Sequence, residues 1–201
     1  MFKTILSCLA LVAASVMPAA AAEPGQPAPA FDVKDVDGNS QSIAHYKGKI
    51  VVLEWNNPDC PFVRKHYGAG NMQALQQYAT GKGVVWLTIN SGAAGKEGAL
   101  DEAKARQKVK DVGGHETAYI LDPQGVLGRM YGAKATPHMF VIDAQGNLAY
   151  EGAIDDKATA DPEDIKTAHN YVRDAIDALL AGKQVTVAQT RAYGCSVKYN
   201  D

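Results

Sequence analysis

The chain has 201 residues, of which 46% are hydrophobic and 21% are charged, and its formal net charge is −2. This composition is ordinary for a globular protein and excludes a disordered or collagen-like chain, and the length suits one domain. The near-neutral charge offers no basic face, so no nucleic-acid partner is expected.

The first 22 residues have the pattern of a secretory signal peptide. Lys3 precedes an apolar segment at 5–16, and three alanines, 20–22, stand before Glu23. The apolar segment is too short to span a bilayer, although an uncleaved anchor is the alternative. We therefore expect residues 1–22 to be removed and residues 23–201 to form one domain. The product is then exported, periplasmic or extracellular, with no membrane attachment.

Hydrophobic patterning and turn signals predict an alternating series of strands and helices. A small hairpin is expected around the turn at 37–39. Strands are predicted at 50–55, 84–90, 118–122, 139–143 and 148–154, and helices at 61–78, 98–112, 126–131 and 162–181. Alternation followed by an antiparallel hairpin predicts an α/β domain with a central mixed β-sheet and helices on both faces.

Cys60 is the leading candidate for a reactive group. It follows the predicted buried strand 50–55 and stands at the start of the predicted helix 61–78, with Pro61 suited to the first helical turn. Unpaired N–H groups and the helix dipole at this position favour a thiolate, which is the nucleophile in disulfide exchange. The alternative is an inert cysteine packed in the core. The polar loop before Cys60 favours the reactive interpretation.

Two ordered segments carry a family resemblance: Cys60-Pro-Phe-Val63, and 135–142 with its Thr-Pro pair. Together with Tyr150-Glu-Gly-Ala-Ile-Asp-Asp156, they resemble the thioredoxin-like superfamily, most closely the AhpC/TSA-type redoxins of a peroxiredoxin-like branch. The resemblance implies a thioredoxin-like three-layer sandwich and an antioxidant-type thiol oxidoreductase without a cofactor. It also implies a protein or small-molecule disulfide or hydroperoxide as substrate, and a thiol as electron donor.

The resemblance also implies roles for individual residues. Thr136 and Pro137 match the threonine–cis-proline loop that offers its backbone to an extended substrate, with Pro61 and Phe62 beside the reactive sulfur. Glu54, six residues before Cys60, matches the buried acid that serves as proton acceptor in thioredoxins.

The sequence departs from two motifs of its relatives. Val63 stands where thioredoxins carry the second cysteine of Cys-x-x-Cys, so a local resolving thiol is absent. Leu53 and Asn57 stand where peroxiredoxins carry the proline and threonine of Pro-x-x-x-Thr-x-x-Cys. An efficient peroxidase of the usual design is therefore not expected.

Cys195, on a tail after the last predicted helix, is a candidate resolving cysteine for Cys60. A tail can fold back over a domain, and Cys195 could then attack an oxidised Cys60. The alternatives are a static disulfide that anchors the tail, or a spare thiol.

A second class of function rests on His138, which follows Pro137 and is expected near Cys60. A thiolate and an imidazole suit copper(I) or zinc, so the alternative is a redoxin-fold protein that binds copper or a partner without turnover. A lone histidine near a cleft is more often a hydrogen-bonded surface residue. A third hypothesis is an inactive structural relative.

Overall fold

The computed structural model describes residues 22–200, so the predicted signal peptide lies outside the described residues except for Ala22. The strands are β1 (Asp32–Lys34), β2 (Ser40–Ser42), β3 (Val51–Trp55), β4 (Val85–Asn90), β5 (Ala118–Leu121), β6 (Ala135–Thr136), β7 (His138–Ile142), β8 (Leu148–Gly152) and β9 (Cys195–Ser196). The helices are α1 (Pro61–Gly68), α2 (Asn71–Gly81), α3 (Glu102–Val112), α4 (Val126–Tyr131) and α5 (Tyr171–Leu180), with a 3₁₀ helix η1 (Pro162–Thr167).

A five-stranded sheet in the order β5-β4-β3-β7-β8 forms the centre of the molecule. Strand β3 pairs in parallel with β4 and antiparallel with β7, and β7 forms a hairpin with β8. The sheet is therefore mixed, as the sequence predicts. The predicted N-terminal hairpin is confirmed as the separate β1–β2 ribbon.

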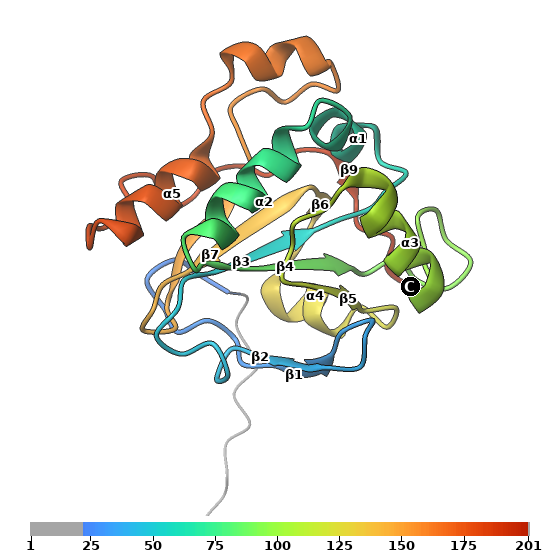
Figure 1. Cartoon of the computed structure of the whole chain (residues 1–201), viewed down its shortest axis with the longest axis horizontal. Coiled ribbons are helices and arrows are strands. Elements are labelled where there is room, and N and C mark those ends of the chain that lie inside the picture. The colour runs from blue at the N-terminus through green and yellow to red at the C-terminus, as the bar shows by residue number, and fades with distance from the viewer. Residues whose placement is uncertain (1–21, 201) are drawn as a thin grey trace, which may run out of the picture.

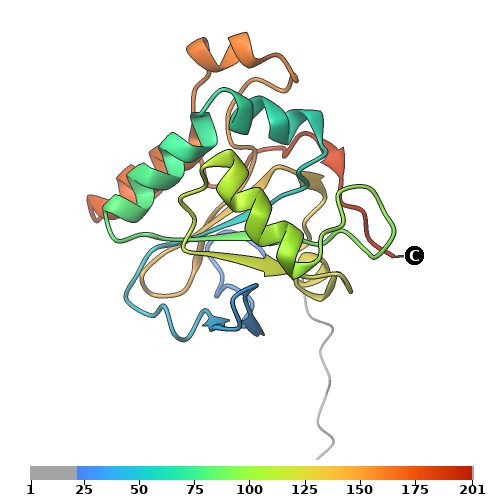
Figure 2. The ribbon, with the colours of Figure 1, turned by 45° about the vertical axis from the view of Figure 1, so that its right-hand side comes forward.

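Two hydrophobic clusters cover the two faces of the sheet and produce the three predicted layers. Side chains alternate along β3, so Leu53 joins the cluster that includes Leu127 of α4, whereas Val52 joins the cluster with Met72 of α2 and Ile176 of α5. Figures 1 and 2 show α1, α2, α3 and α5 on one side of the sheet, and α4 with the β1–β2 ribbon on the other. By alternation, Glu54 shares the face of α1 and α2 with Val52.

The predicted helix 61–78 is in fact two helices, which corrects the sequence-based boundary. Helix α1 ends at Gly68 and α2 begins at Asn71, after Gly70, whose φ of 71° is left-handed. Glycine adopts this conformation without steric cost and is unfavourable inside a helix, so the segment Gly68-Ala-Gly70 breaks the helix. The break sets α1 apart as a short helix between two sites described below.

The predicted helix 162–181 is also divided. Residues Pro162–Thr167 form the 3₁₀ helix, and α5 begins after Asn170, whose side chain accepts a hydrogen bond from Arg173 N at 2.8 Å. Asparagine is a favourable N-cap, and this local signal decides where the second helix starts. The predicted inward positions Val172 and Ile176 are buried on α5.

The C-terminal tail returns along the sheet edge and forms a strand that the sequence analysis does not predict. Strand β9 pairs antiparallel with β6, with Thr136 opposite Cys195. Figure 1 shows this segment, in red, crossing from α5 towards α3 beneath α1. Among residues 22–200, no helix has both the length and the apolar character needed to cross a membrane.

Candidate functional site

Cys60 stands at the helix start that the sequence predicts. Strand β3 ends at Trp55, a short loop follows, and Cys60 is the N-cap of α1 with φ −66° and ψ 125°. Pro61 occupies the first helical turn, where its missing N–H costs no helical hydrogen bond. The backbone thus places the sulfur beside the free N–H groups of α1.

The two cysteines of the described chain lie together. Cys60 Sγ is 2.7 Å from Cys195 Sγ and 3.0 Å from the carbonyl oxygen of Thr136, and both cysteines are free thiols in this structure. Cys60 is fully buried and Cys195 is half-buried. None of the three hydrophobic clusters includes Cys60. The sulfur of Cys60 thus lies against Cys195 of the tail and the Thr136 carbonyl.

The two thiols differ in acidity. Burial acts to raise the pKa of Cys60, but hydrogen bonds from the side chains of Cys195 and Thr136 and from the Val63 N–H outweigh it, and the net pKa is lowered. Burial, followed by the neighbouring Cys60, raises the pKa of Cys195 to about 12. Cys60 is therefore the more acidic thiol of the pair, and Cys195 is the thiol that holds its proton to higher pH.

The threonine–proline loop lies where the resemblance implies. The Thr136–Pro137 peptide is cis, and Thr136 Oγ1 donates to the carbonyl oxygen of Cys195 at 3.4 Å. Gly194 permits this close approach, because a Cβ at that position would lie 2.0 Å from Thr136 O. The backbone expected to receive an extended substrate is thus paired with the chain's own tail.

Phe62 and Glu54 contact different parts of the molecule near α1. The Phe62 ring contacts the tail at Tyr193, with ring centroids 5.8 Å apart. Glu54 is fully buried and accepts hydrogen bonds from Asn56 Nδ2 and Tyr67 Oη, each at 2.9 Å. Burial raises the pKa of Glu54 although these donors oppose the rise. None of its hydrogen bonds reaches Cys60, so its contact with the sulfur is not direct.

The structure does not bring His138 to Cys60, which corrects the expectation that the two are neighbours. His138 pairs across the ladder with Trp55 and packs its ring on Phe140, on the α4 side of the sheet. Its Nε2 lies 3.9 Å from Glu151. Strand alternation turns this side chain away from α1. Within residues 22–200, no three His, Cys, Asp or Glu side chains are grouped to hold a metal ion.

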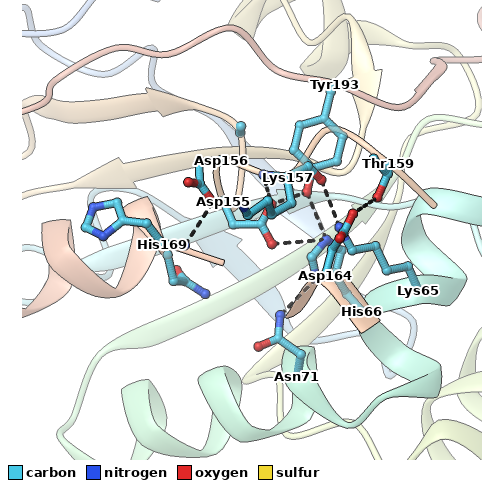
Figure 3. Close-up of polar contacts among 12 residues, drawn as sticks. Lys65, His66, Asn71, Asp155, Asp156, Lys157, Thr159, Asp164, His169 and Tyr193 are labelled. Carbon is cyan, nitrogen blue, oxygen red and sulfur yellow. Dashed lines mark hydrogen bonds and ion pairs between the residues drawn. The ribbon is translucent and has the colours of Figure 1, made fainter. Parts of the chain in front are cut away.

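A buried polar network next to the cysteines escapes the sequence analysis. Tyr193 of the tail donates its hydroxyl to Asp155 Oδ1, and the same hydroxyl lies 3.2 Å from His66 Nε2. Asn71 lies 2.8 Å from the other ring nitrogen of His66. Lys65 Nζ donates to the carbonyl oxygen of Lys157 at 2.8 Å. Figure 3 shows the Tyr193 ring reaching from the tail over this cluster.

The network fixes the tail two residues before Cys195. His66 and Asp155 are almost completely buried, and burial lowers the pKa of His66 to about 4, so its imidazole is neutral at physiological pH. The available sequence signal was the pair of tyrosines, Tyr193 and Tyr199, that flank Cys195 on an otherwise aperiodic tail. Tyr199 also anchors the tail, by donating to Ala133 O at 2.8 Å.

Comparison with known proteins agrees with this architecture. A hypothetical protein from Sinorhizobium meliloti 1021 is 25% identical with a TM-score of 0.75, covering 90% of this chain and 97% of that one. An uncharacterized conserved protein from Geobacillus kaustophilus is 26% identical with a TM-score of 0.75, covering 89% and 93%. A putative thiol:disulfide interchange protein DsbE from Chlorobium tepidum shares the fold at 23% identity and a TM-score of 0.54, covering 65% and 85%.

The sequence match to a family is more specific than these structural likenesses. Residues 23–169 match the Redoxin family, and the matched region covers the five-stranded sheet, helices α1 to α4 and Cys60. The thioredoxin-like superfamily and the three-layer fold expected from the sequence are confirmed. This chain belongs to the Redoxin family.

Proposed function

We propose that this chain is an exported thiol–disulfide oxidoreductase in which Cys60 is the nucleophile and Cys195 the resolving cysteine. One observation carries the proposal: the two sulfurs lie 2.7 Å apart at the start of α1, with the pKa of Cys60 lowered and that of Cys195 raised. A low-pKa thiolate beside a second thiol is the arrangement that disulfide exchange requires.

The exchange conserves atoms and electrons. The Cys60 thiolate attacks one sulfur of a substrate disulfide, a mixed disulfide forms, and the other substrate sulfur leaves as a thiolate that takes a proton from solvent. Cys195 then gives up its proton and attacks Cys60 Sγ, which releases the second substrate thiolate. The substrate is reduced by two electrons and Cys60–Cys195 becomes a disulfide, which an external thiol donor reduces.

A hydroperoxide is the second substrate class of the proposal. The Cys60 thiolate would attack the terminal peroxide oxygen, giving a sulfenic acid and, after protonation, an alcohol or water. Cys195 would condense with that sulfenic acid, forming the same disulfide and releasing water. Leu53 and Asn57 replace the motif residues of peroxiredoxins, so we expect this reaction to be the slower of the two.

Other residues receive supporting roles in the proposal. The Thr136–Pro137 backbone would hold an extended substrate once the tail moves away, with Pro61 and Phe62 flanking the sulfur. Glu54 would act as the proton acceptor that the resemblance implies, and its raised pKa suits proton exchange near neutral pH better than that of an ordinary carboxyl.

Export is supported by the signal-like pattern of residues 1–22, which precede the part of the chain that matches the Redoxin family. An oxidising compartment would also allow the cysteine pair to cycle as a disulfide. The test is N-terminal sequencing of the protein recovered from the exported fraction of an expressing cell. We expect Glu23 as the first residue, and an intact Met1 would overturn export.

The catalytic proposal is tested by titration and redox equilibration of the mature protein. Thiolate absorbance should show one ionisation below pH 9 that disappears in Cys60→Ser. In thiol–disulfide buffers, mass spectrometry should then detect a Cys60–Cys195 disulfide with a reduction potential above about −300 mV, the value below which structural disulfides usually lie. A lower potential, or a Cys60 pKa above 9, would overturn the proposal in favour of a static disulfide or an inert thiol.

A further inference from the structure

A cavity lies on the other side of α1 from the cysteines. It is an open pocket of about 490 Å³ between α1, α2 and α3, and its walls include Val63 of α1, Gln73 of α2 and Val112 of α3. Glu116 and Tyr119, from the segment that leads into β5 and from β5 itself, complete the inner wall. We call this space the α1–α3 cavity.

The α1–α3 cavity concentrates the unpaired polar groups of the molecule. Among residues 22–200, four buried side-chain oxygens lack a hydrogen-bond partner, and three of them are Gln73 Oε1, Glu116 Oε2 and Tyr119 Oη. All three residues line this cavity, and Tyr119 is only 5% exposed. Buried polar groups are nearly always paired, because leaving one unpaired costs about 1–3 kcal/mol. Three such groups in one cavity indicate that the partner is a molecule from outside the chain.

The chemistry of these oxygens defines what the partner must offer. Gln73 uses both hydrogens of Nε2 to donate to the carbonyl oxygens of Tyr67 and Val112, at 2.9 and 2.7 Å, so the orientation of its amide is fixed and Oε1 is an acceptor. Burial raises the pKa of the Glu116 carboxyl to about 7, and a cation bound beside it would favour the ionised form, in which Oε2 is an acceptor; the Tyr119 hydroxyl can accept too. A ligand with three donors and a positive charge matches this set of acceptors in number and in charge.

We propose that the α1–α3 cavity binds a primary ammonium group carried on an alkyl stem. The three N–H donors of the ammonium match Gln73 Oε1, Glu116 Oε2 and Tyr119 Oη in number. The apolar walls formed by Val63, Val109 and Val112 suit the stem. The Glu116 carboxylate would repel an anion, which would also offer the three oxygens no hydrogen-bond donor. A neutral hydrocarbon would leave the oxygens unpaired.

The charges at the mouth of the cavity do not reverse this preference. Arg64 and Lys108 border the cavity together with Asp111. Arg64 is already paired with Asp59 at 2.7 Å, and Asp111 offsets the charge of Lys108. The innermost carboxyl, that of Glu116, has no ion-pair partner among the described residues, so a cation beside it gains an ion pair that an anion or a neutral molecule cannot form. Replacing Lys108 by methionine removes a repulsive charge and should tighten binding.

The experiment compares three probes of similar size by NMR titration of the mature protein: n-butylammonium, 1-butanol and butyrate. We expect saturable n-butylammonium binding, with shifts at Val63, Val112 and Tyr119, and at least tenfold weaker binding of the other two. Glu116→Gln should weaken n-butylammonium binding by about tenfold or more, because a charge-assisted hydrogen bond is lost. Tyr119→Phe should weaken it several-fold. Glu163→Gln, at an exposed glutamate of η1, is the matched control and should change nothing.

Two further arms separate the source of the ammonium and the dependence on the cysteines. Nα-acetyl-lysine amide carries the same head group on a peptide; binding tighter than n-butylammonium assigns the site to a partner's lysine, and weaker binding assigns it to a free amine. Cys60→Ser should leave affinity unchanged. Absence of saturable n-butylammonium binding, equal binding of 1-butanol, or full affinity in both Glu116→Gln and Tyr119→Phe would overturn the proposal.

Discussion

Helix α1 separates two buried polar regions that differ in whether the chain itself pairs their hydrogen-bonding groups. On one side, Phe62 and His66 face the tail, where the cysteine pair and the Tyr193 network are satisfied almost entirely by the chain itself. On the other side, Val63 and Tyr67 face the α1–α3 cavity, where three oxygens have no partner in the described chain. Residues four apart share a helix face, so a single short helix presents both regions.

The difference shows which of the two regions needs a ligand to pair its buried polar groups. The tail side is closed by residues 193–199, so an external molecule must displace contacts that already exist. The cavity side is open and unsatisfied, so a ligand adds contacts without removing any. Substitutions on the two sides of α1 and a change of pH test this contrast.

The largest effect should come from Cys60→Ser. Because the proposed nucleophile is lost, we expect disulfide reduction to fall by at least about a thousandfold, to the background of the buffer. Cys195→Ser should instead leave the first attack intact and trap a mixed disulfide on Cys60. Stopped-flow assays with mass spectrometry of the quenched protein separate the two. Equal activity of Cys195→Ser and the unmodified protein over many turnovers would contradict the role of Cys195.

Acid should weaken the tail side through His66. Its folded pKa of about 4 lies below its unfolded value of about 6.5, so the unfolded chain takes up the proton first and stability is lost as the pH falls from about 6.5 to 4. The gap corresponds to at most about 3 kcal/mol. In His66→Gln this part of the loss in unfolding free energy should disappear. Urea unfolding at several pH values measures it.

Other groups also change stability as the pH falls through this range, and they are present in both the unmodified protein and His66→Gln. His138, with a pKa also lowered to about 4 by burial, adds to the acid loss, whereas Glu54 and Glu116, whose pKa values are raised, oppose it. The difference between the unmodified protein and His66→Gln therefore isolates His66. Parallel stability curves for the two proteins would show that its burial is not as described.

Tyr193→Phe should loosen the tail without removing a sulfur. The change leaves Asp155 and His66 without their shared partner, and we expect a loss of about 1–3 kcal/mol in unfolding free energy. Cys195 should then react faster with an alkylating reagent, because its segment is held less firmly. Unchanged alkylation of Cys195 would mean that β9 and Tyr199 hold the tail on their own.

Tyr119→Phe is the matched change on the cavity side and should have the smallest effect. Its hydroxyl has no partner within the described chain, so its removal should change stability by less than about 0.5 kcal/mol, or stabilise the protein slightly. The pair Tyr193→Phe and Tyr119→Phe thus compares the same chemical deletion in a satisfied and an unsatisfied region. A loss above 1 kcal/mol for Tyr119→Phe would contradict the contrast.

Local sequence signals predicted the core of the fold and the position of Cys60. The strand that ends at Trp55, Pro61 in the first helical turn and the Thr136–Pro137 pair all act over a few residues, so they can be read without the structure. The helix breaks also had local signals, at Gly70 and Asn170. The apolar periodicity continues across both positions, so the sequence predicted one uninterrupted helix in each case.

The remaining features depend on where distant segments meet. Tyr193 reaches Asp155 and His66 only because the tail returns along the sheet edge, and no period in residues 183–201 indicates that path. The α1–α3 cavity likewise depends on how three helices pack over β5. Glu54 was predicted as a buried acid, but its separation from the sulfur could not be known without the positions of Tyr67 and Asn56, which occupy its oxygen atoms.

Because β9 pairs with β6, the tail competes with any external strand for the edge of β6. A tethered strand is present at its own binding edge at an effective concentration of about millimolar, whatever the amount of protein in solution. A polypeptide client at micromolar concentration would have to bind that edge about a thousandfold better than the tail to occupy it half of the time. A small oxidant that reaches one of the sulfurs without lifting Ser196 from Ala135 does not compete with the tail.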